Sequence, residues 1–374
     1  MSPTMLAARF HAPHDIRIDH IPLPSPTPSQ VLLQISWAGI CGSDLHEYLI
    51  GPQTIPAPDR PHPITKSTLP CPMGHEFCGV VAPLSPAQPQ KSANGLPLVE
   101  GAKVIVDPRL YCAREDCENC AKGATNACPK WGFHGLSGCC GGFSKCVAVE
   151  ARMCYVLPAE TDLSFAALIE PLAVAWHAVK VAGVGRFEGK KVLIVGGGPI
   201  GIALVYVLRV FGCQMVVVSE PTALRRSQDE KVADIVLDPT KVKVAEECKR
   251  LTNGSGVDVV FDAAGVERGL KDGVDALKYG GTYVNIAGWE TPFTIPWFPF
   301  MLKDMRVQGS MAYNDEDFAE TVQAYIEGKF KGVESMVTSR ISLKDTKEKG
   351  FEELINNKDY HIKIMISPHD NASS

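Results

Sequence analysis

No stretch of this sequence approaches about 18 uninterrupted apolar residues, the length that a membrane-spanning helix needs. The first residues also lack the basic segment followed by an apolar run that marks a secretory signal. We therefore expect a cytoplasmic protein without a membrane partner.

An excess of basic charge is missing as well. The chain has 37 Lys and Arg against 42 Asp and Glu, which gives a net charge of -5. No basic run is present that could neutralise the phosphates of a nucleic acid. A nucleic-acid partner is therefore not expected.

Cysteine, by contrast, is abundant, with 13 residues in a chain of 374. Without a secretory signal, clustered cysteines indicate metal ligands before they indicate disulfides. Four of them follow the pattern C-x4-C-x2-C-x7-C, at Cys112, Cys117, Cys120 and Cys128. Four thiolates in one compact loop, spanning 108–130, predict a closed tetrahedral zinc site with a structural role. The alternative is a set of reduced thiols without a metal.

Eight further cysteines are scattered along the chain, and we expect them to be small core residues. They are Cys71, Cys78, Cys139, Cys140, Cys146, Cys154, Cys213 and Cys248.

The chain is longer than one hydrophobic core usually supports, so two domains are expected. Up to about residue 160 the sequence contains frequent Pro and Gly residues and short β-branched runs such as 31–36 and 103–107. This composition is typical of an irregular β domain. The stretch between Glu47 and Met73 contains seven prolines, and a lid or an oligomer contact is the expected role.

After about residue 163 the pattern changes to alternating helices and buried strands, which predicts βα units around a parallel sheet. Expected strands span 190–196, 214–219, 235–237, 257–262 and 282–287, and expected helices span 165–181, 200–211 and 269–277. After about residue 300 the chain returns to mixed structure. The fold class is therefore an α/β doubly wound domain, 164–300, inserted in a β-rich domain formed by 1–163 and 301–374.

A glycine-rich turn lies between the first of these strands and its helix. Gly196, Gly198 and Gly201 fit G-x-G-x-x-G, with Pro199 and Ile200 between the last two glycines. The three glycines serve a tight turn, the approach of a pyrophosphate and close packing of helix on strand. This context predicts a dinucleotide-binding site rather than a structural turn.

Glu220 ends the next strand, where a carboxylate would bind the hydroxyls of the adenosine ribose. Because a carboxylate there repels a 2′-phosphate, NAD is favoured over NADP. Arg225 and Arg226 follow closely and could receive a phosphate, or simply form a solvated helix face with one guanidinium beside the adenine.

Another constellation lies near the N-terminus. Cys41 is followed by Ser43 and His46, and after the proline-rich loop come His75 and Glu76. A thiolate, an imidazole and a carboxylate from two segments are what an open zinc site needs. Taken alone, each could equally be an ordinary core or surface residue.

Together these features resemble the zinc-dependent medium-chain alcohol and polyol dehydrogenases, over nearly the whole chain, with the nearest match in the 2,3-butanediol dehydrogenase branch. The phrases that carry the likeness are Gly39-Ile-Cys-Gly-Ser-Asp-Leu-His-Glu-Tyr-Leu49, Gly74-His-Glu76, Ile169-Glu-Pro-Leu172 with Trp176-His177, Val218-Ser-Glu-Pro221 and Gly309-Ser-Met-Ala-Tyr-Asn314.

The resemblance implies a GroES-like catalytic domain and a Rossmann domain. It also implies a catalytic zinc on Cys41 and His75, in addition to the structural zinc, so two zinc ions per chain. Glu76 and Glu170 would supply carboxylates that ligate this zinc or hold its water. The family shows both arrangements and exchange between them, so both residues stay candidates.

Further roles follow from the same likeness. Ser43 would take the substrate's hydroxyl proton and pass it through the cofactor ribose towards His46, while Asp44 would orient its neighbours. Tyr48, Trp131 and Trp289 are candidates for the wall of a substrate pocket. A homodimer or homotetramer is expected.

Two departures of the sequence from the family pattern bear on the predicted sites. The first cysteine spacing is x4 where the family usually has x2. Ala312 stands where sorbitol-like enzymes carry an arginine that holds substrate hydroxyls, which argues against a long polyol.

The expected activity is zinc-dependent, reversible transfer of a hydride between NAD and a secondary alcohol, with a small vicinal diol or the matching hydroxyketone as substrate. Alternatives are a reductase of a specialised biosynthetic substrate, a sorbitol-like polyol dehydrogenase, and a cofactor-binding regulatory protein whose metals only stabilise the fold.

Overall fold

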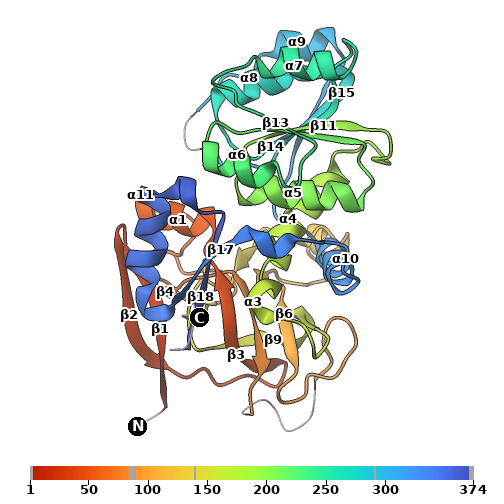
Figure 1. Cartoon of the computed structure of the whole chain (residues 1–374). Coiled ribbons are helices and arrows are strands. Elements are labelled where there is room, and N and C mark those ends of the chain that lie inside the picture. The colour runs from red at the N-terminus through yellow and green to blue at the C-terminus, as the bar shows by residue number, and fades with distance from the viewer. Residues whose placement is uncertain (1–2, 84–89, 139, 290–291, 370–374) are drawn as a thin grey trace. The chain divides into compact units, whose positions relative to one another are not determined.

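The computed structural model describes residues 3–83, 90–138, 140–289 and 292–369. The chain folds into two compact units. The first unit comprises Met1–Glu170, Asn314–Glu327 and Val337–Ser374, and the second comprises Pro171–Tyr313 and Gly328–Met336. The second unit is thus inserted in the first (Figure 1).

The first unit is built on β structure. A three-stranded sheet has the order β2-β1-β4, and a seven-stranded sheet has the order β10-β6-β5-β3-β18-β17, with β9 also paired to β3. The strands are β1 (Thr4–Ala12), β2 (Asp15–Pro22), β3 (Gln30–Gly39), β4 (Cys71–Pro72), β5 (Glu76–Val81), β6 (Lys103–Val106), β9 (Cys146–Glu150), β10 (Cys154–Val156), β17 (Val337–Ser342) and β18 (Lys363–Ser367). The β-branched runs of the sequence at 31–36 and 103–107 lie in β3 and β6.

The register of this sheet brings distant parts of the chain together. β3 pairs antiparallel with β5 so that Gly39 lies opposite Glu76, and β18 pairs with β3 so that Met365 also lies opposite Gly39. The end of β3 therefore lies between the start of β5 and the C-terminal strand. The helix α1 (Gly42–Ile50) leaves the sheet at this point.

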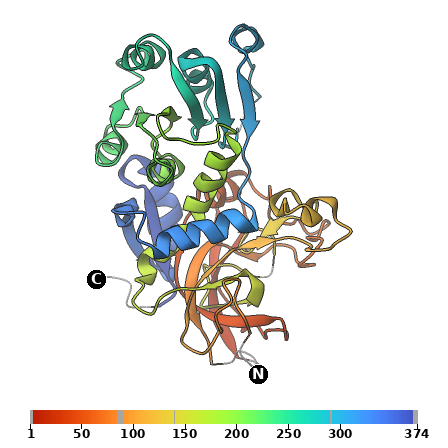
Figure 2. The same ribbon diagram turned by 90° about the vertical axis from the view of Figure 1, so that its right-hand side faces the viewer.

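Several smaller elements complete the first unit. The helices are α2 (Glu118–Ala121), α3 (Leu163–Ala166), α10 (Asp315–Ile326) and α11 (Glu353–Asn356), and β7 (Arg109–Leu110) pairs with β8 (Gly132–Phe133) at the base of the cysteine-rich loop. This loop, coloured gold in Figure 2, projects from the body of the unit.

The second unit is a six-stranded parallel sheet with the order β13-β12-β11-β14-β15-β16. The strands are β11 (Lys191–Val195), β12 (Met215–Ser219), β13 (Ile235–Leu237), β14 (Val257–Asp262), β15 (Leu277–Asn285) and β16 (Arg306–Gly309), and the helices are α5 (Pro199–Val210), α6 (Ala223–Asp229), α7 (Val244–Leu251), α8 (Glu267–Ala276) and α9 (Trp297–Leu302). The order reverses beside β11, so the crevice at its carboxyl end is where a doubly wound sheet binds a nucleotide. The predicted Rossmann architecture is confirmed.

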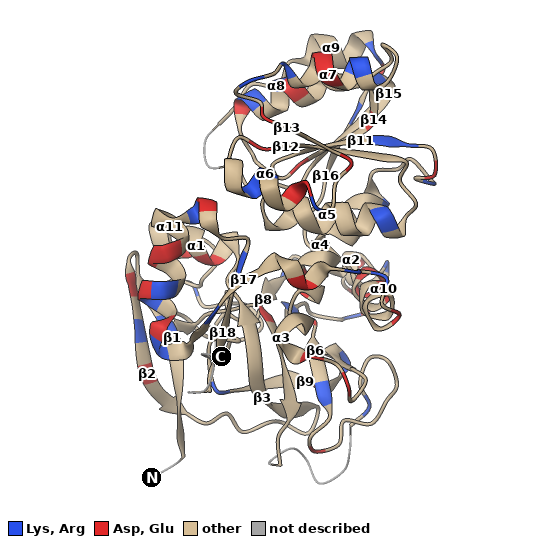
Figure 3. Ribbon diagram, viewed as in Figure 1, with Lys and Arg blue, Asp and Glu red and all other residues tan. Residues whose placement is uncertain are grey.

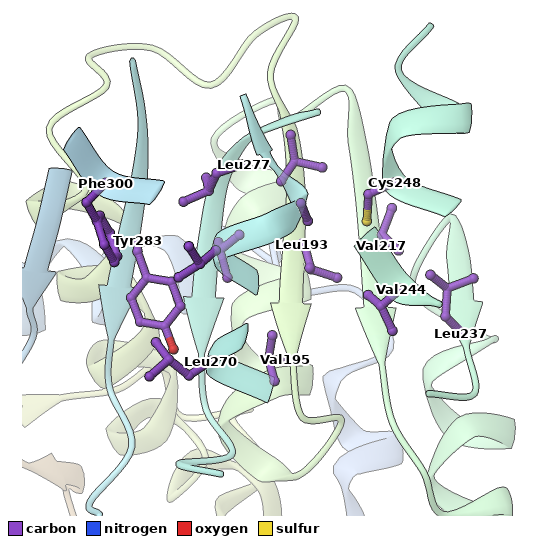
Figure 4. Close-up of a cluster of buried hydrophobic side chains, with 14 residues drawn as sticks. Leu193, Val195, Val217, Leu237, Val244, Cys248, Leu270, Leu277, Tyr283 and Phe300 are labelled. Carbon is purple, nitrogen blue, oxygen red and sulfur yellow. The ribbon is translucent and has the colours of Figure 1, made fainter. Parts of the chain in front are cut away.

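One face of this sheet is covered by α7, α8 and α9. Leu193 and Val217 of the strands pack with Val244 of α7, Leu270 of α8 and Phe300 of α9 (Figure 4). The sequences of these strands are nearly continuous apolar runs, because both faces of a parallel sheet are buried.

One helical detail differs from the sequence-based expectation. The helix expected at 165–181 is divided into α3 and α4 (Ile169–Val181). The combined stretch Leu163–Val181 is apolar and long enough to cross a membrane, but 78% of its window is buried inside the protein. That burial is typical of a core helix.

The cysteines outside the candidate metal sites are mostly core residues, as predicted. Cys71, Cys78, Cys140, Cys154, Cys213 and Cys248 are buried and Cys146 is partly buried. Cys139 lies outside the described residues. Lys and Arg are interspersed with Asp and Glu over both units (Figure 3).

Candidate metal centres and dinucleotide turn

Cys41, His75 and Glu76 form one compact group in the first unit. Their potential ligand atoms all lie within 4.8 Å of one another, and His75 and Glu76 are 4% and 1% exposed. Cys41 stands directly before α1, and the other two residues stand at the start of β5, which the β3–β5 register brings alongside. A thiolate, an imidazole and a carboxylate at this spacing fit zinc and leave a fourth position open.

Polar side chains flank both nitrogens of the His75 imidazole. Its Nδ1 lies 3.4 Å from Asp44 Oδ1, and its Nε2 lies 3.2 Å from Ser43 Oγ. Asp44 also accepts a hydrogen bond from the backbone N–H of Cys41 at 2.9 Å. Burial opposes a charge on His75, but Asp44 and the Cys41 sulfur outweigh it and hold the His75 pKa well above its ordinary value. Negative charge from Asp44 and the Cys41 sulfur is therefore concentrated around this ring.

Glu76 has one oxygen engaged and one without a partner. Lys363 Nζ donates to Glu76 Oε1 at 2.7 Å and to the Ile40 carbonyl at 3.0 Å, while Glu76 Oε2 is buried and makes no hydrogen bond. A Cβ on Gly39 would lie only 2.2 Å from Oε2, so glycine is required opposite this carboxylate. A buried carboxylate oxygen without a hydrogen-bond partner fits the role of a metal ligand.

Lys363 itself was missed by the sequence analysis. It is 1% exposed; burial opposes its charge, but Glu76, Cys41 and Glu170 outweigh that effect and raise its pKa. A single lysine within the apolar run Ile362–Ile366 was the signal that could have found it, because Lys is almost never fully buried without a partner.

Glu170 lies close enough to Lys363 for its charge to raise the Lys363 pKa. It is 3% exposed in the first turn of α4, and it is not part of the group formed by Cys41, His75 and Glu76 among the described residues. In this structure the carboxylate grouped with the thiol and the imidazole is that of Glu76.

Ser43 and His46 lie in α1, three residues apart. That spacing places their side chains on one face of the helix. Ser43 is exposed and His46 is half-buried.

The four cysteines predicted as structural ligands are also assembled. Their sulfur atoms all lie within 4.8 Å of one another, and Cys112 Sγ lies 3.7 Å from Cys120 Sγ and 3.6 Å from Cys128 Sγ. With zinc–sulfur bonds of about 2.3 Å, the edge of a tetrahedron is about 3.8 Å, so the separations fit a tetrahedral zinc. The backbone N–H groups of Cys112 and Lys130 point at Cys128 Sγ, at 3.5 and 3.4 Å, as they would for a thiolate.

The longer first spacing is absorbed locally. Ala113 adopts a left-handed conformation with φ of 50°, and Arg114 forms an exposed ion pair with Asp116. The two extra residues therefore bulge towards solvent, and the four sulfurs still meet.

A partly buried ion network connects the cysteine-rich loop to the rest of the first unit. Arg109 donates to Thr125 Oγ1 at 2.8 Å and to Asp315 Oδ1 at 2.7 Å, and Tyr111 donates to Asp315 Oδ2 at 2.7 Å. Asp315 opens α10, so the network ties the loop to a helix that is distant in sequence.

The glycine turn of the second unit has the expected geometry. Gly196 has φ of 97°, and a Cβ on Gly201 would lie 1.9 Å from the Gly196 carbonyl oxygen. Gly198 caps α5, whose first two residues are Pro199 and Ile200. Glycine is required at Gly196 for the backbone conformation and at Gly201 for close packing.

Glu220 follows β12 and contacts this turn. Its Oε2 accepts the N–H of Gly197 at 2.8 Å, and its Oε1 accepts the N–H of Thr222 at 2.8 Å. Arg225 Nη1 lies 3.7 Å from where a Cβ of Gly198 would be. Arg226 instead pairs with Asp238 at 3.0 Å and is held by backbone carbonyls. Of the two arginines, Arg225 is the one at the turn.

The candidate pocket residues lie in different surroundings. Trp131 is 38% exposed and packs edge-on against Phe133, which in turn packs edge-on against His75. Tyr48 is buried against Phe351 and donates to Glu352 at 3.4 Å. In the second unit Trp289 stacks on Phe293 and donates to Asn285 Oδ1, and Ala312 has a left-handed φ of 48°.

Two family models match this chain. Residues 27–159 match the alcohol dehydrogenase GroES-like domain, and residues 199–327 match the zinc-binding dehydrogenase domain.

Curated relatives extend over the full length. The chain is 38% identical to the (R,R)-butanediol dehydrogenase of Neisseria gonorrhoeae over 367 residues, covering 98% of this chain and 100% of the relative. It is 31% identical to D-xylulose reductase A of Aspergillus oryzae, covering 96% of this chain and 95% of the relative.

A solved structure is also similar to this chain over nearly its full length. The crystal structure of 2R,3R-butanediol dehydrogenase from Bacillus subtilis has a TM-score of 0.87 and 35% identity, covering 98% of this chain and 100% of that one. This chain belongs to the zinc-binding alcohol dehydrogenase family and is an oxidoreductase that uses zinc and a nicotinamide dinucleotide.

Proposed function

We propose that this protein transfers a hydride between a small vicinal diol, or the matching hydroxyketone, and NAD. The observation that carries the proposal is the group of Cys41, His75 and Glu76, whose ligand atoms lie within 4.8 Å of one another. The names of the relatives at 38% and 35% identity, both butanediol dehydrogenases, point to the substrate class.

Cys41 and His75 would hold the catalytic zinc, and Glu76 would supply the third ligand or exchange with Glu170. Bound zinc supplies a Lewis acid that makes an alcohol hydroxyl easier to deprotonate. Asp44 would fix the His75 ring through Nδ1, in the way carboxylates orient metal-binding histidines. Lys363 would hold Glu76 on its other oxygen.

Ser43 and His46 would move the proton. Ser43 lies 3.2 Å from Nε2 of His75, so its hydroxyl is close to the metal group and can accept a hydrogen bond from a substrate hydroxyl. His46 is a half-buried imidazole on the same helix, and an imidazole suits release of that proton to solvent.

The second unit would hold the cofactor. The pyrophosphate would lie at the N-terminus of α5, against the turn from Gly196 to Gly201. Glu220 would face the adenosine ribose and disfavour a 2′-phosphate, and Arg225 would flank the adenine. Bound NAD supplies the hydride acceptor.

The four cysteines, Cys112, Cys117, Cys120 and Cys128, would hold the second zinc and stabilise the loop. Trp131, which packs towards His75 through Phe133, is the strongest of the pocket candidates in the first unit. Tyr48 and Trp289 stay as weaker candidates.

A sorbitol-like polyol activity is the second candidate, because D-xylulose reductases are among the relatives. Ala312 disfavours it, since its methyl group offers no hydrogen bond to a substrate hydroxyl. Assays with NAD and a panel of 2,3-butanediol stereoisomers, sorbitol and xylitol separate the two. Faster turnover of a polyol than of any short diol contradicts our assignment.

Reduction assays with acetoin and diacetyl, using NADH and NADPH, address the possibility of a specialised reductase. Zinc analysis of Cys41→Ala addresses a purely structural role for the metals. A fall from about two to about one zinc per chain, with loss of turnover, supports the enzyme. An unchanged count favours a structural role.

We further propose that the protein is a cytoplasmic homo-oligomer. β16 is an edge strand of the sheet in the second unit, and all four of its residues are exposed. In α9, Trp297, Phe298 and Met301 are 59%, 68% and 73% exposed. An open strand edge beside an apolar helix is a surface that a second copy can pair with and cover.

A further inference from the structure

Asp229 is a carboxyl group that the proposed reaction does not use. It is the last residue of α6, is completely buried, and neither of its oxygens has a hydrogen-bond partner. Buried polar groups are normally hydrogen-bonded, because desolvation without a partner is costly. A buried carboxyl without a partner therefore calls for a physical explanation.

The carboxyl group lies against the dinucleotide turn. A Cβ built on Gly197 would lie 1.9 Å from Asp229 Oδ2 and 2.8 Å from its Cγ, and no other residue is among the three nearest atoms. Asp229 thus occupies the space that a side chain at position 197 would need. The backbone N–H of the same glycine donates to Glu220 Oε2 at 2.8 Å.

Two carboxyl groups therefore meet at one residue of the turn. Burial, followed by the charge of Glu220, raises the pKa of Asp229 to about 8, while Arg225 opposes this and the neighbouring Glu230 adds to it. Two adjacent carboxyls in a site of low polarity cannot both be ionised cheaply, and Glu220 is the one with N–H donors to support its charge. At neutral pH Asp229 is accordingly a neutral acid.

The state of this acid matters for the cofactor. The turn has to receive a pyrophosphate, which carries negative charge. A neutral Asp229 supports Gly197 without repelling that charge, whereas an ionised Asp229 adds a negative charge directly behind the turn.

We propose that Asp229 is a positioning residue of the dinucleotide turn, whose neutral carboxyl fills the space behind Gly197 and whose ionised form weakens dinucleotide binding. This inference rests on the cofactor site proposed above.

The first test measures NADH binding by fluorescence from about pH 6 to about pH 9.5, in the wild type and in Asp229→Asn. Wild-type affinity should fall through the alkaline range at least about threefold more than that of Asp229→Asn, since the amide cannot ionise. Glu246→Gln, which removes an exposed charge that does not act on the Asp229 pKa, is the matched control and should keep the wild-type profile. Parallel profiles for the wild type and Asp229→Asn overturn the proposal.

The second test addresses the shared space. Gly197→Ala should weaken NADH binding at least about tenfold, because its methyl group and the Asp229 carboxyl cannot coexist. The double variant Gly197→Ala with Asp229→Ala should recover most of the loss, since the methyl then replaces the carboxyl. A double variant that binds no better than Gly197→Ala contradicts the packing role.

The third test needs no cofactor. Because the pKa of Asp229 is raised in the folded protein, its contribution to stability is complete below the unfolded pKa of about 4 and is lost as pH rises to about 8. Asp229→Asn should therefore melt at a progressively higher temperature than the wild type across this range. A melting difference that does not change with pH overturns the neutral-acid assignment.

Together the tests separate two kinds of failure. If the wild type binds no NADH at any pH, the proposed cofactor site is wrong and the positioning role fails with it. If NADH binds normally but Asp229→Asn shifts neither the binding profile nor the melting profile, only the inference about Asp229 is wrong.

Discussion

Lys363 Nζ donates to Glu76 Oε1 at 2.7 Å, and both side chains are only 1% exposed. The two residues are 287 positions apart and meet because β3 pairs with both β5 and β18. A buried pair of this kind is strongly destabilising to break from one side, because the remaining charge is left uncompensated.

Lys363→Met should therefore destabilise the metal-free protein by about 3 to 5 kcal/mol. Zinc should recover part of the loss, since a cation beside Oε2 compensates Glu76. Thermal unfolding with and without zinc measures both effects. Lys241→Met changes a side chain that is 76% exposed. It should alter the free energy of unfolding by no more than about 0.5 kcal/mol, both with and without zinc.

The paired substitution Lys363→Met with Glu76→Gln checks the same relationship. It should be clearly more stable than Lys363→Met alone, because no buried charge is left unpaired. Additive losses from the two changes would show that the residues do not act as a pair.

Cys120→Ser should reduce the zinc content from about two to about one per chain and lower stability by about 3 kcal/mol or more, which is the scale of losing a structural metal. Metal analysis and thermal unfolding provide the measurements. Cys146→Ser is the matched control, because Cys146 lies outside both metal groups and should leave the zinc content unchanged.

Glu220→Ala should weaken NADH binding about 10- to 100-fold, because a buried, charge-assisted hydrogen bond to Gly197 is lost together with the ribose contact. The loss for NADPH should be much smaller, so the preference between the two cofactors narrows. Titrations with both dinucleotides measure this. Equal losses of affinity for NADH and NADPH would show that Glu220 does not determine which of the two cofactors is preferred.

Met301→Glu with Val307→Glu should convert the oligomer into smaller species, because it places charges on the exposed face of α9 and on β16. Sedimentation velocity measures the change, and circular dichroism shows whether the fold is retained. Leu96→Glu, also at an exposed apolar position but in the first unit, should leave the oligomer intact.

Local patterns were predictable from the sequence. The glycine turn, its strand and its helix are specified within about a dozen residues by backbone geometry, and the structure has β11 and α5 where they were expected. The four cysteines likewise lie within one short loop, so their spacing alone implied that the sulfurs could meet. The β-branched runs at 31–36 and 103–107 indicated strands for the same local reason.

What the tertiary structure decided involves partners far apart in the chain. The grouping of Glu76, rather than Glu170, with Cys41 and His75 depends on the register of β5 against β3. Lys363 reaches Glu76 only through β18, and Asp229 lies behind Gly197 only because α6 packs against the turn. Sequence periodicity specifies which face of an element is apolar, but it does not specify which distant residue a buried charge will meet, because that depends on strand order and register.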